Sequence, residues 1–589
     1  MNKNNNNMNF LRASILALLT LIFPCVVSGQ IQLDYMNNRS PEWHEVIAMY
    51  ARLDSIYPSA RLIETGTTDV GKPLHLFIIS RDKIFDPEQI RQAGKRILFI
   101  NNGIHPGESN GIDASLEFAA ELLAGKHAST QLLDNTVLLI VPVFNVGGAL
   151  NRSPYHRANQ DGPVEHGFRG NARNLDLNRD FVKMDTRNAR SIAKTIHAWD
   201  PDIFVDTHST NGADYPYTVT LISSHHQKLE APQGRFMKMV LEPALFRAMN
   251  ASPYKMCHYV NVFRTTPDQG FSGFIDAPRY LAGYATTFHI LSFTLETHML
   301  KPYDERVRST KYFLHEILKF THDHDGEIAR NKQLAIRQGM DKQEHVLQWE
   351  IDSARREMIL FDGYRAKTKP GEVTGQQRLY YDREDPWTDS IPFYNYFRPA
   401  VTVEKPDYYI IPGAWQEVIE RLQCSGISMQ QLPNDTTLQV EAYYIEDFMT
   451  TQEPYNGHYW HYNTSVRKKS ESIRLFAGDY VIPVRQRGAD FIVQTLEPEG
   501  YDSYFSWNFF DAVLSRKEYF SPYLFEETAA ELLAEDADLR QRFNDKRTAE
   551  PDFAENAIAQ LRWIYEHSPW SEPTYRRYPV YRYNGKLNE

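Results

Sequence analysis

The chain has 589 residues, of which 42% are hydrophobic, 24% charged and 13% aromatic, and its formal net charge is −11. At roughly 100–200 residues per domain this length provides for two to four domains, and the composition excludes a disordered or collagen-like chain. The negative balance argues against a general nucleic-acid binder, which needs a basic face to neutralise phosphates.

Residues 1–29 have the pattern of a cleaved secretory signal. A weakly basic segment precedes an apolar run over residues 15–23, and small residues then offer a cleavage site before Gln30. The run is too short to cross roughly 30 Å of hydrocarbon as a helix, which disfavours a retained anchor. The residues ahead of Cys25 fit lipid attachment poorly. We therefore expect an exported protein, periplasmic or secreted, without stable membrane insertion.

From residue 36 to 325, continuous apolar runs alternate with apolar residues at helical spacing. Such runs are typical of strands that are covered on both faces. The predicted strands span residues 96–100, 136–144, 202–206 and 288–295, and the predicted helices 112–123 and 189–199. This alternation predicts an α/β domain whose mixed, mostly parallel sheet is sandwiched by helices.

The pattern changes beyond residue 325. Residues 326–358 predict a helical connector, and residues 359–504 are rich in Tyr, Val and Thr with turn residues. We expect a second, β-rich α+β domain there, with a helix near residues 414–422. Residues 505–589 return to helical patterns. The two cysteines of the mature chain, Cys257 and Cys424, either pair or are separate buried thiols.

Chemistry-bearing residues follow the predicted strands. His105 and Glu108 come directly after the strand at 96–100, where open α/β sheets place ligand crevices. His208 ends the strand at 202–206, and Glu296 ends the strand at 288–295. Two His and one Glu make a zinc site with an open fourth position, and a second Glu beside it can take a proton from water. Four such residues at strand ends predict a catalytic zinc centre with one zinc per chain.

Polar residues between these strands offer the remaining functions. Asn178 and Arg179 place an amide beside a guanidinium, a pair suited to a substrate carboxylate. Upstream, Arg152 and Arg157 lie in a polar loop, and one of them could face a developing oxyanion.

Four ordered motifs resemble those of the zinc metallocarboxypeptidases of the carboxypeptidase A type. They are His105-x-x-Glu108, Leu175-Asp-Leu-Asn178-Arg179, Asp206-Thr-His208-Ser209 and Phe293-Thr-Leu-Glu296, and the resemblance covers about residues 40–325. It implies a carboxypeptidase-like fold for that half of the chain and a peptide substrate.

The resemblance also implies a role for each matching residue. His105, Glu108 and His208 would bind zinc, and Glu296 would be the general base. Arg157, rather than Arg152, would stabilise the oxyanion. The implied supporting roles are carboxylate binding by Asn178 and Arg179, orientation of the first zinc histidine by Asp176, the floor of the side-chain pocket by Thr294, and closure over the substrate by Tyr280, with Tyr284 as its alternative.

This chain departs from the family pattern at one position, and the departure leaves the identity of the substrate undecided. Many family members carry an arginine between the first His and the Glu, where this chain has Pro106-Gly107. The leading interpretation is an exported zinc exopeptidase acting on the C-terminal bond of peptides. An amidase or carboxypeptidase for cell-wall peptides is the nearest alternative. A non-catalytic peptide- and glycan-binding protein is the other, because Tyr455, Tyr459, Trp460 and Tyr462 cluster in the C-terminal domain, where they suggest glycan or cell-wall contact.

Overall fold

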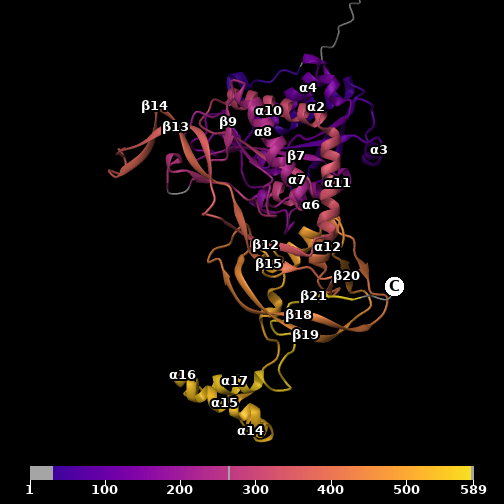
Figure 1. The fold of residues 1–589 in the computed structure, drawn as a ribbon, viewed down its shortest axis with the longest axis vertical. Coiled ribbons are helices and arrows are strands. Elements are labelled where there is room, and N and C mark those ends of the chain that lie inside the picture. The colour runs from indigo at the N-terminus through magenta and orange to yellow at the C-terminus, as the bar shows by residue number, and fades with distance from the viewer. Residues whose placement is uncertain (1–30, 263–264, 586–589) are drawn as a thin grey trace, which may run out of the picture.

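The computed structural model describes residues 31–262 and 265–585, which form three successive parts along the long axis of the molecule (Figure 1). The predicted signal peptide, residues 1–29, lies outside the described residues. Within them, no helix combines the length and the apolar character needed to cross a bilayer.

An eight-stranded mixed sheet forms the centre of the N-terminal part. In order across the sheet its strands are β1 (Ala60–Thr67), β2 (Pro73–Ile79), β4 (Thr136–Val141), β3 (Arg96–Asn102), β7 (Ile203–Thr210), β11 (Leu291–His298), β8 (Val219–Ser223) and β9 (Met256–His258). The four central strands, β4, β3, β7 and β11, are parallel, as are β8 and β9 at one edge, whereas the other pairs are antiparallel. The α/β prediction and its four strands are confirmed.

The central strands are apolar throughout because both faces of the sheet are covered. In β3, Ile97 and Phe99 enter one core and Leu98 and Ile100 the other, since side chains alternate along a strand. The helices that contribute residues to the second core include α2 (Trp43–Ile56), α4 (Asn110–Leu123), α8 (Glu242–Asn250) and α10 (Tyr303–Asp323). Residues from α3 (Pro87–Gln92), α6 (Arg187–Trp199) and α9 (Leu281–Thr286) line the first.

Shorter elements complete this part. They are η1 (Tyr35–Asn37), η2 (Lys126–Leu133), α5 (Val146–Leu150), β5 (Arg152–Ser153), β6 (His166–Gly167), η3 (Leu177–Arg179), α7 (Ala231–Phe236), η4 (Met237–Leu241), η5 (Pro267–Gln269) and β10 (Phe271–Ser272).

The predicted helical connector, residues 326–358, is helical only in its first half. Helix α11 (Asp325–Asp341) is followed by strand β12 (Glu344–Ile351), which pairs antiparallel with β15 (Phe397–Glu404). His345 and Leu347 are buried and lie two residues apart, the period of a strand and not of a helix. The all-helical prediction is therefore wrong for this second half.

A long ribbon connects β12 to β15 and projects from the N-terminal part (Figure 1). Its strands, β13 (Glu357–Pro370) and β14 (Gln377–Tyr394), pair antiparallel, and β10 pairs with the end of β14. Phe361 and Phe393 at the base of the ribbon share a core with Tyr215 and Cys257. The base of the ribbon thus packs on the α/β part, and the boundary predicted at residue 359 does not separate two bodies.

The second part contains a six-stranded sheet. Its order is β17 (Gln430–Gln431), β20 (Tyr480–Pro483), β16 (Tyr408–Ile411), β21 (Tyr581–Tyr583), β18 (Thr436–Thr450) and β19 (His461–Leu475). Two helices accompany it, α12 (Gln416–Cys424), close to the helix predicted at 414–422, and α13 (Ala489–Leu496), and a short turn, η6 (Asp511–Leu514), follows. Strand β21 brings the end of the chain into the sheet, so residues 505–589 are not helical throughout.

One hydrophobic core is shared by the first two parts. Phe99 and Ile192 of the α/β part belong to the same buried cluster as Ile411, Phe491 and Trp507 of the second part. The second domain therefore packs against one face of the α/β fold. Cys257 and Cys424 are both free and lie in different clusters, which answers the question of their pairing in favour of separate thiols.

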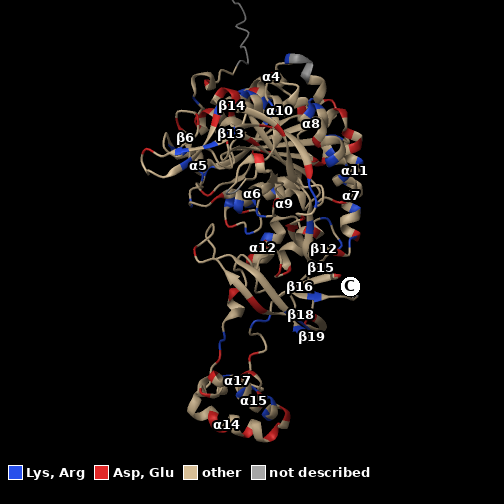
Figure 2. Ribbon diagram, turned by 60° about the vertical axis from the view of Figure 1, so that its left-hand side comes forward, with Lys and Arg blue, Asp and Glu red and all other residues tan. Residues whose placement is uncertain are grey.

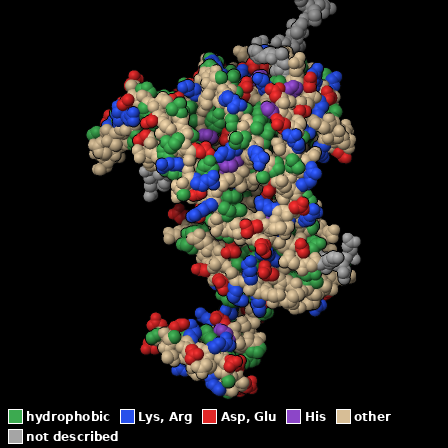
Figure 3. Space-filling view, in the orientation of Figure 1, with side chains coloured by type: hydrophobic (Ala, Val, Ile, Leu, Met, Phe, Trp, Pro, Cys, Tyr) green, Lys and Arg blue, Asp and Glu red, His purple; other side chains and the backbone are tan. Residues whose placement is uncertain are grey.

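Two chain segments connect a small helical unit to the second domain (Figures 1 and 2). Its helices are α14 (Pro522–Glu535), α15 (Ala537–Ala549), α16 (Pro551–Ala554) and α17 (Ala557–Glu566). They enclose a core of their own, which includes Phe525, Phe543 and Leu561. On the face seen in Figure 3, acidic and basic side chains are interspersed over all three parts.

Candidate active site

Three neighbouring strands bring the predicted zinc ligands and the predicted base together. β3, β7 and β11 lie side by side and run parallel, so their carboxyl ends meet at one edge of the sheet. His105 and Glu108 follow β3, His208 lies on β7, and Glu296 lies on β11 directly across from His208 in the strand register. Residues far apart in the sequence thus converge because of the strand order.

The two histidines and Glu108 form a buried triad. His208 Nδ1 lies 3.0 Å from Glu108 Oε2, and His105 Nδ1 lies 3.4 Å from Glu108 Oε1. One ligand atom from each residue lies within 4.8 Å of those of the other two, and all three side chains are buried. Two imidazoles and one carboxylate at this separation fit a zinc ion and leave a fourth position open.

Each histidine is oriented from behind by an aspartate. His105 Nε2 lies 3.0 Å from Asp176 Oδ1, as the resemblance implied, and His208 Nε2 lies 2.7 Å from Asp206 Oδ2. These contacts occupy the Nε2 atoms and leave both Nδ1 atoms for a metal, the arrangement usual for zinc-binding histidines. Asp206 was not predicted, although its spacing of two from His208 places both side chains on the same face of a strand.

Glu296 lines the same cavity without taking part in the triad. Its Oε2 atom is buried and has no hydrogen-bond partner among the described residues. Burial and the neighbouring Glu108 raise the pKa of Glu296 to about 7. A bound divalent cation would oppose this shift, because its charge favours the ionised carboxylate. The geometry leaves Glu296 free to exchange a proton with a water molecule.

The cavity has a volume of about 370 Å³. The other predicted site residues that line it are Arg157, Asn178, Arg179, Tyr280 and Thr294. Asp176 lies behind His105 and not on the cavity wall. Arg152 also lies elsewhere, where it donates hydrogen bonds to the carbonyls of Ser40, Pro41 and Glu165.

Two arginines approach Glu108, and only Arg157 was predicted. Arg157 donates to Gln160, to Glu108 Oε1 at 2.8 Å and to the carbonyl of Ser209, so each of its three nitrogens has a protein partner. Arg169 contacts Asp176 through Nε and Nη2, and its Nη1 lies 3.3 Å from His105 Nδ1. The Arg169 side chain is 46% exposed and that of Arg157 14%, so Arg169 has more room to meet a substrate.

Asn178 and Arg179 lie on the short turn η3. Asn178 Oδ1 accepts a hydrogen bond from the backbone of Leu281, which fixes the amide. The Arg179 guanidinium lies 4.5 Å from the centre of the Tyr280 ring, a cation–π contact. The predicted closing residue, Tyr280, therefore lies at the predicted carboxylate site.

The alternative closing residue, Tyr284, is excluded by its position. It is fully buried in the core, and its hydroxyl lies 2.7 Å from His197 Nε2. Helix α9 begins directly after Tyr280, and the following turn directs Tyr284 inward.

The structure explains the departure at Gly107. A Cβ atom at this position would lie 2.7 Å from the carbonyl oxygen of Gly167 and 2.9 Å from Cδ of Arg157. Contacts this short exclude a side chain, so no arginine can occupy the position found in many family members. The loop that carries Arg157 fills the space instead.

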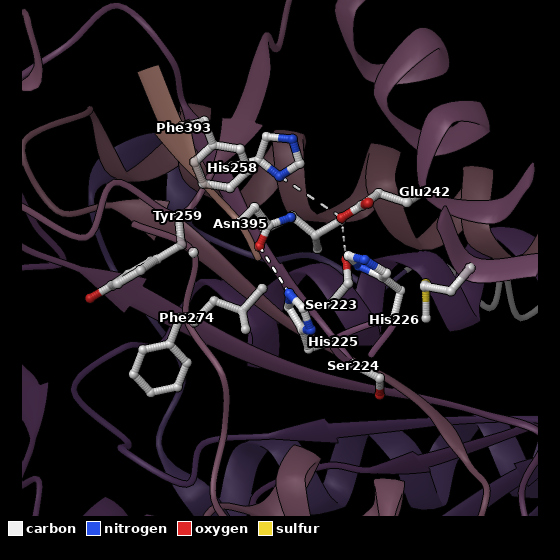
Figure 4. A pocket seen from close by; sticks show the side chains of 14 residues that line it. Ser223, Ser224, His225, His226, Glu242, His258, Tyr259, Phe274, Phe393 and Asn395 are labelled. Carbon is white, nitrogen blue, oxygen red and sulfur yellow. Dashed lines mark hydrogen bonds and ion pairs between the residues drawn. The ribbon is translucent and has the colours of Figure 1, made fainter. Parts of the chain in front are cut away.

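A second, smaller cavity adjoins the first and shares Ile222, Tyr259 and Phe274 with it. Figure 4 shows Glu242 between Ser223, which donates to it at 2.8 Å, and His258, with His225 beside Asn395. Its volume of about 30 Å³ is room for about two water molecules. The larger cavity, whose wall includes Thr294, therefore offers more room for a ligand than the smaller one.

Comparison with known proteins identifies the domain that carries the triad. Residues 46–227 match the family model described as zinc carboxypeptidase. The chain carries a zinc carboxypeptidase domain. The match to the zinc carboxypeptidase model includes all three triad residues and ends before Glu296. The protein is accordingly a zinc-dependent hydrolase of the carboxypeptidase class.

Other proteins resemble the zinc carboxypeptidase domain and the segment after it. The chain is 20% identical over 427 residues to carboxypeptidase 2 of Trichophyton rubrum and to that of Trichophyton tonsurans, which covers 70% of this chain and 73% of each relative. A metallo-carboxypeptidase from Burkholderia cenocepacia is 22% identical, with a TM-score of 0.36, and the match covers 49% of this chain and 70% of that one. Carboxypeptidase A from Helicoverpa armigera is 16% identical, with a TM-score of 0.36 over 56% of this chain and 80% of that one.

Proposed function

We propose that this protein is an exported zinc exopeptidase that hydrolyses the C-terminal peptide bond of peptides. The observation that carries the proposal is the shared cavity, which is lined by the zinc triad, by Glu296 and by the pair Asn178–Arg179; the Oε2 atom of Glu296 has no hydrogen-bond partner among the described residues. A carboxylate-binding arginine near a hydrolytic centre suits a substrate that ends close to the bond to be cut.

The residues divide the reaction between them. When bound, zinc supplies a Lewis acid that polarises the peptide carbonyl and makes water more acidic. Glu296 takes the proton of the attacking water and gives it to the leaving amine. Arg179 and Asn178 hold the terminal carboxylate, and Tyr280 covers it. Asp176 and Asp206 keep the two histidines in position.

The test is hydrolysis of a mixed peptide library by the mature, zinc-loaded protein, followed by mass spectrometry. We expect peptides to lose single residues from the C-terminus, and we expect the same peptides with an amidated C-terminus to be poor substrates, because they lack the carboxylate. Cleavage at internal or N-terminal bonds would overturn the proposal. Cleavage of cell-wall peptides alone would support the amidase or carboxypeptidase alternative.

We further propose that Arg169 stabilises the oxyanion and that Arg157 positions Glu108. Arg169→Gln is expected to lower kcat about 100-fold with little change in KM, because the lost charge faces the substrate only as the carbonyl oxygen becomes negative. Steady-state kinetics check this, with zinc content measured on the same samples. Arg173→Gln is the control, since Arg173 is an exposed neighbour that contacts the carbonyl of Asp185 instead. If kcat were unchanged in Arg169→Gln, Arg157 and not Arg169 would be the residue that stabilises the oxyanion.

Export follows from the pattern of residues 1–29 and is part of the proposal. N-terminal sequencing of the protein recovered outside the cytoplasm should begin at Gln30. Recovery of an intact Met1 in the soluble cytoplasmic fraction would contradict it.

A further inference from the structure

We propose that a loop of the second domain is a working part of the active site. The loop, residues 451–460, connects β18 to β19 and reaches the turn that carries Asn178 and Arg179. In it, Tyr455 positions Arg179, and Asn456 positions Asp176 and through it the zinc ligand His105. The inference rests on the proposed function, because that function gives Arg179 and Asp176 their roles.

Tyr455 fixes one side of the Arg179 guanidinium. Arg179 Nε donates to the Tyr455 hydroxyl at 2.8 Å, and Arg179 Nη1 donates to the carbonyl of Asn178 at 2.8 Å. The Tyr455 ring is itself held by stacking on Trp507, with 6.0 Å between ring centres. An arginine whose orientation is set by other groups loses less conformational freedom when it binds a carboxylate.

Asn456 holds the backbone of Asp176 with two hydrogen bonds. The Asp176 amide donates to Asn456 Oδ1 at 2.7 Å, and Asn456 Nδ2 donates to the Asp176 carbonyl at 3.0 Å. The Asp176 carboxylate in turn contacts His105. Asp176 therefore links Asn456 of the second domain directly to a residue of the zinc triad. Asn456 has a left-handed φ of 50°, which Asn tolerates better than most residues, and Gly457 follows with a φ of 89°.

The loop is anchored on both sides of the domain boundary. His458 Nε2 lies 2.8 Å from Asp185 Oδ2. Arg279, the residue before Tyr280, pairs with the buried Asp502 at 2.7 Å and lies within 4.8 Å of the ring centres of Trp460, Tyr501 and Trp507. Trp460 and Tyr455, two of the aromatic residues first considered for glycan contact, thus pack at this boundary. These contacts keep Tyr455 and Asn456 within hydrogen-bonding distance of Arg179 and Asp176.

The two residues act on different steps, which makes the proposal testable in two ways. Tyr455→Phe removes one hydroxyl and is expected to raise KM for peptides with a free C-terminal carboxylate about tenfold, with kcat changed less than about twofold. Its effect on amidated peptides should be small. Tyr459→Phe removes a hydroxyl from an exposed tyrosine of the same loop and is the matched control.

Binding without turnover gives an independent measurement. In a Glu296→Gln background, calorimetry should show that Tyr455→Phe weakens binding of a free-acid peptide and leaves binding of its amide unchanged. Equal behaviour of Tyr455→Phe and Tyr459→Phe, or equal weakening for both peptides, would overturn the role of Tyr455. A lower melting temperature with unchanged affinity would also overturn it, since that is the result of a structural role alone.

Asn456→Gly tests the contact with the zinc triad. Glycine keeps the left-handed backbone and removes both hydrogen bonds, and zinc affinity measured by chelator competition is expected to fall about tenfold. Asn463→Gly is the control, because Asn463 is exposed, has a φ of 52° and lies away from the site. Unchanged zinc affinity in Asn456→Gly would overturn this half. If the wild type removed no C-terminal residues, the proposed function would fail while the zinc measurement still decided the role of Asn456.

Discussion

Replacing Glu296 with Gln is expected to lower kcat about 1,000-fold and to leave one zinc per chain. The amide has nearly the shape of the carboxylate but cannot accept the proton of the attacking water, and general-base catalysis typically contributes about 10²–10⁴-fold. Glu296 is not a member of the triad, and its Oε2 atom has no hydrogen-bond partner among the described residues, so we expect the variant to keep the zinc ligands and the fold.

The measurement is the initial rate of release of C-terminal residues, with zinc determined on the same samples. Glu242→Gln is the matched control. Glu242 is a partly buried carboxylate in the adjoining cavity that accepts from Ser223, and its neutralisation should leave kcat within about twofold of the wild type. If Glu296→Gln kept more than about a tenth of wild-type kcat with zinc bound, another group would have to be the base.

The zinc triad and Glu296 could be predicted from the sequence because strands carry a strong local signal. Continuous apolar runs identified β3, β7 and β11, and the polar residues at their ends stood out against that background. Parallel strands place their carboxyl ends at one edge, so proximity followed once the strands were neighbours. Asp206 was within reach of the same reasoning, since it shares a strand face with His208.

Residues that depend on tertiary contacts could not be predicted in this way. Arg169 is one arginine among several in an irregular loop, and only the fold shows that it meets His105 while Arg152 points elsewhere. Tyr455 and Asn456 lie more than 270 positions from the residues they bond, and no local pattern indicates such a contact.

The second domain shows the same limit for the fold. Strand β12 has a short alternating pattern inside a segment of helical composition, and the helical prediction was wrong there. Strand β21 has three residues and is stabilised by pairing with β16 and β18, so its partners and not its own sequence determine its structure. The ribbon of β13 and β14 contains the residues of a β-rich domain, but its base packs against the α/β part.

Replacing His208 with Ala is expected to abolish both zinc binding and hydrolysis. The substitution leaves His105 and Glu108 as the only triad ligands, and two ligands bind zinc too weakly for it to stay bound during purification. It also leaves Asp206 Oδ2 without its partner at 2.7 Å, so we expect a melting temperature a few degrees lower, since an unsatisfied buried acceptor costs about 1–3 kcal/mol. Zinc after gel filtration should be below about 0.1 per chain, and added zinc should not restore activity.

His225→Ala is the matched control, because it also removes a buried imidazole with a hydrogen-bond partner, Asn395; His225 lies two residues beyond β8 of the same sheet. It should keep zinc and activity. In the wild type, a chelator should remove activity and added zinc should restore it, because Glu108 has protein partners of its own, Arg157 and the amide of Ser209, that hold it in place. A His208→Ala protein with full zinc content would show that the metal binds elsewhere, and activity in zinc-free wild type would contradict the hydrolytic role of the triad.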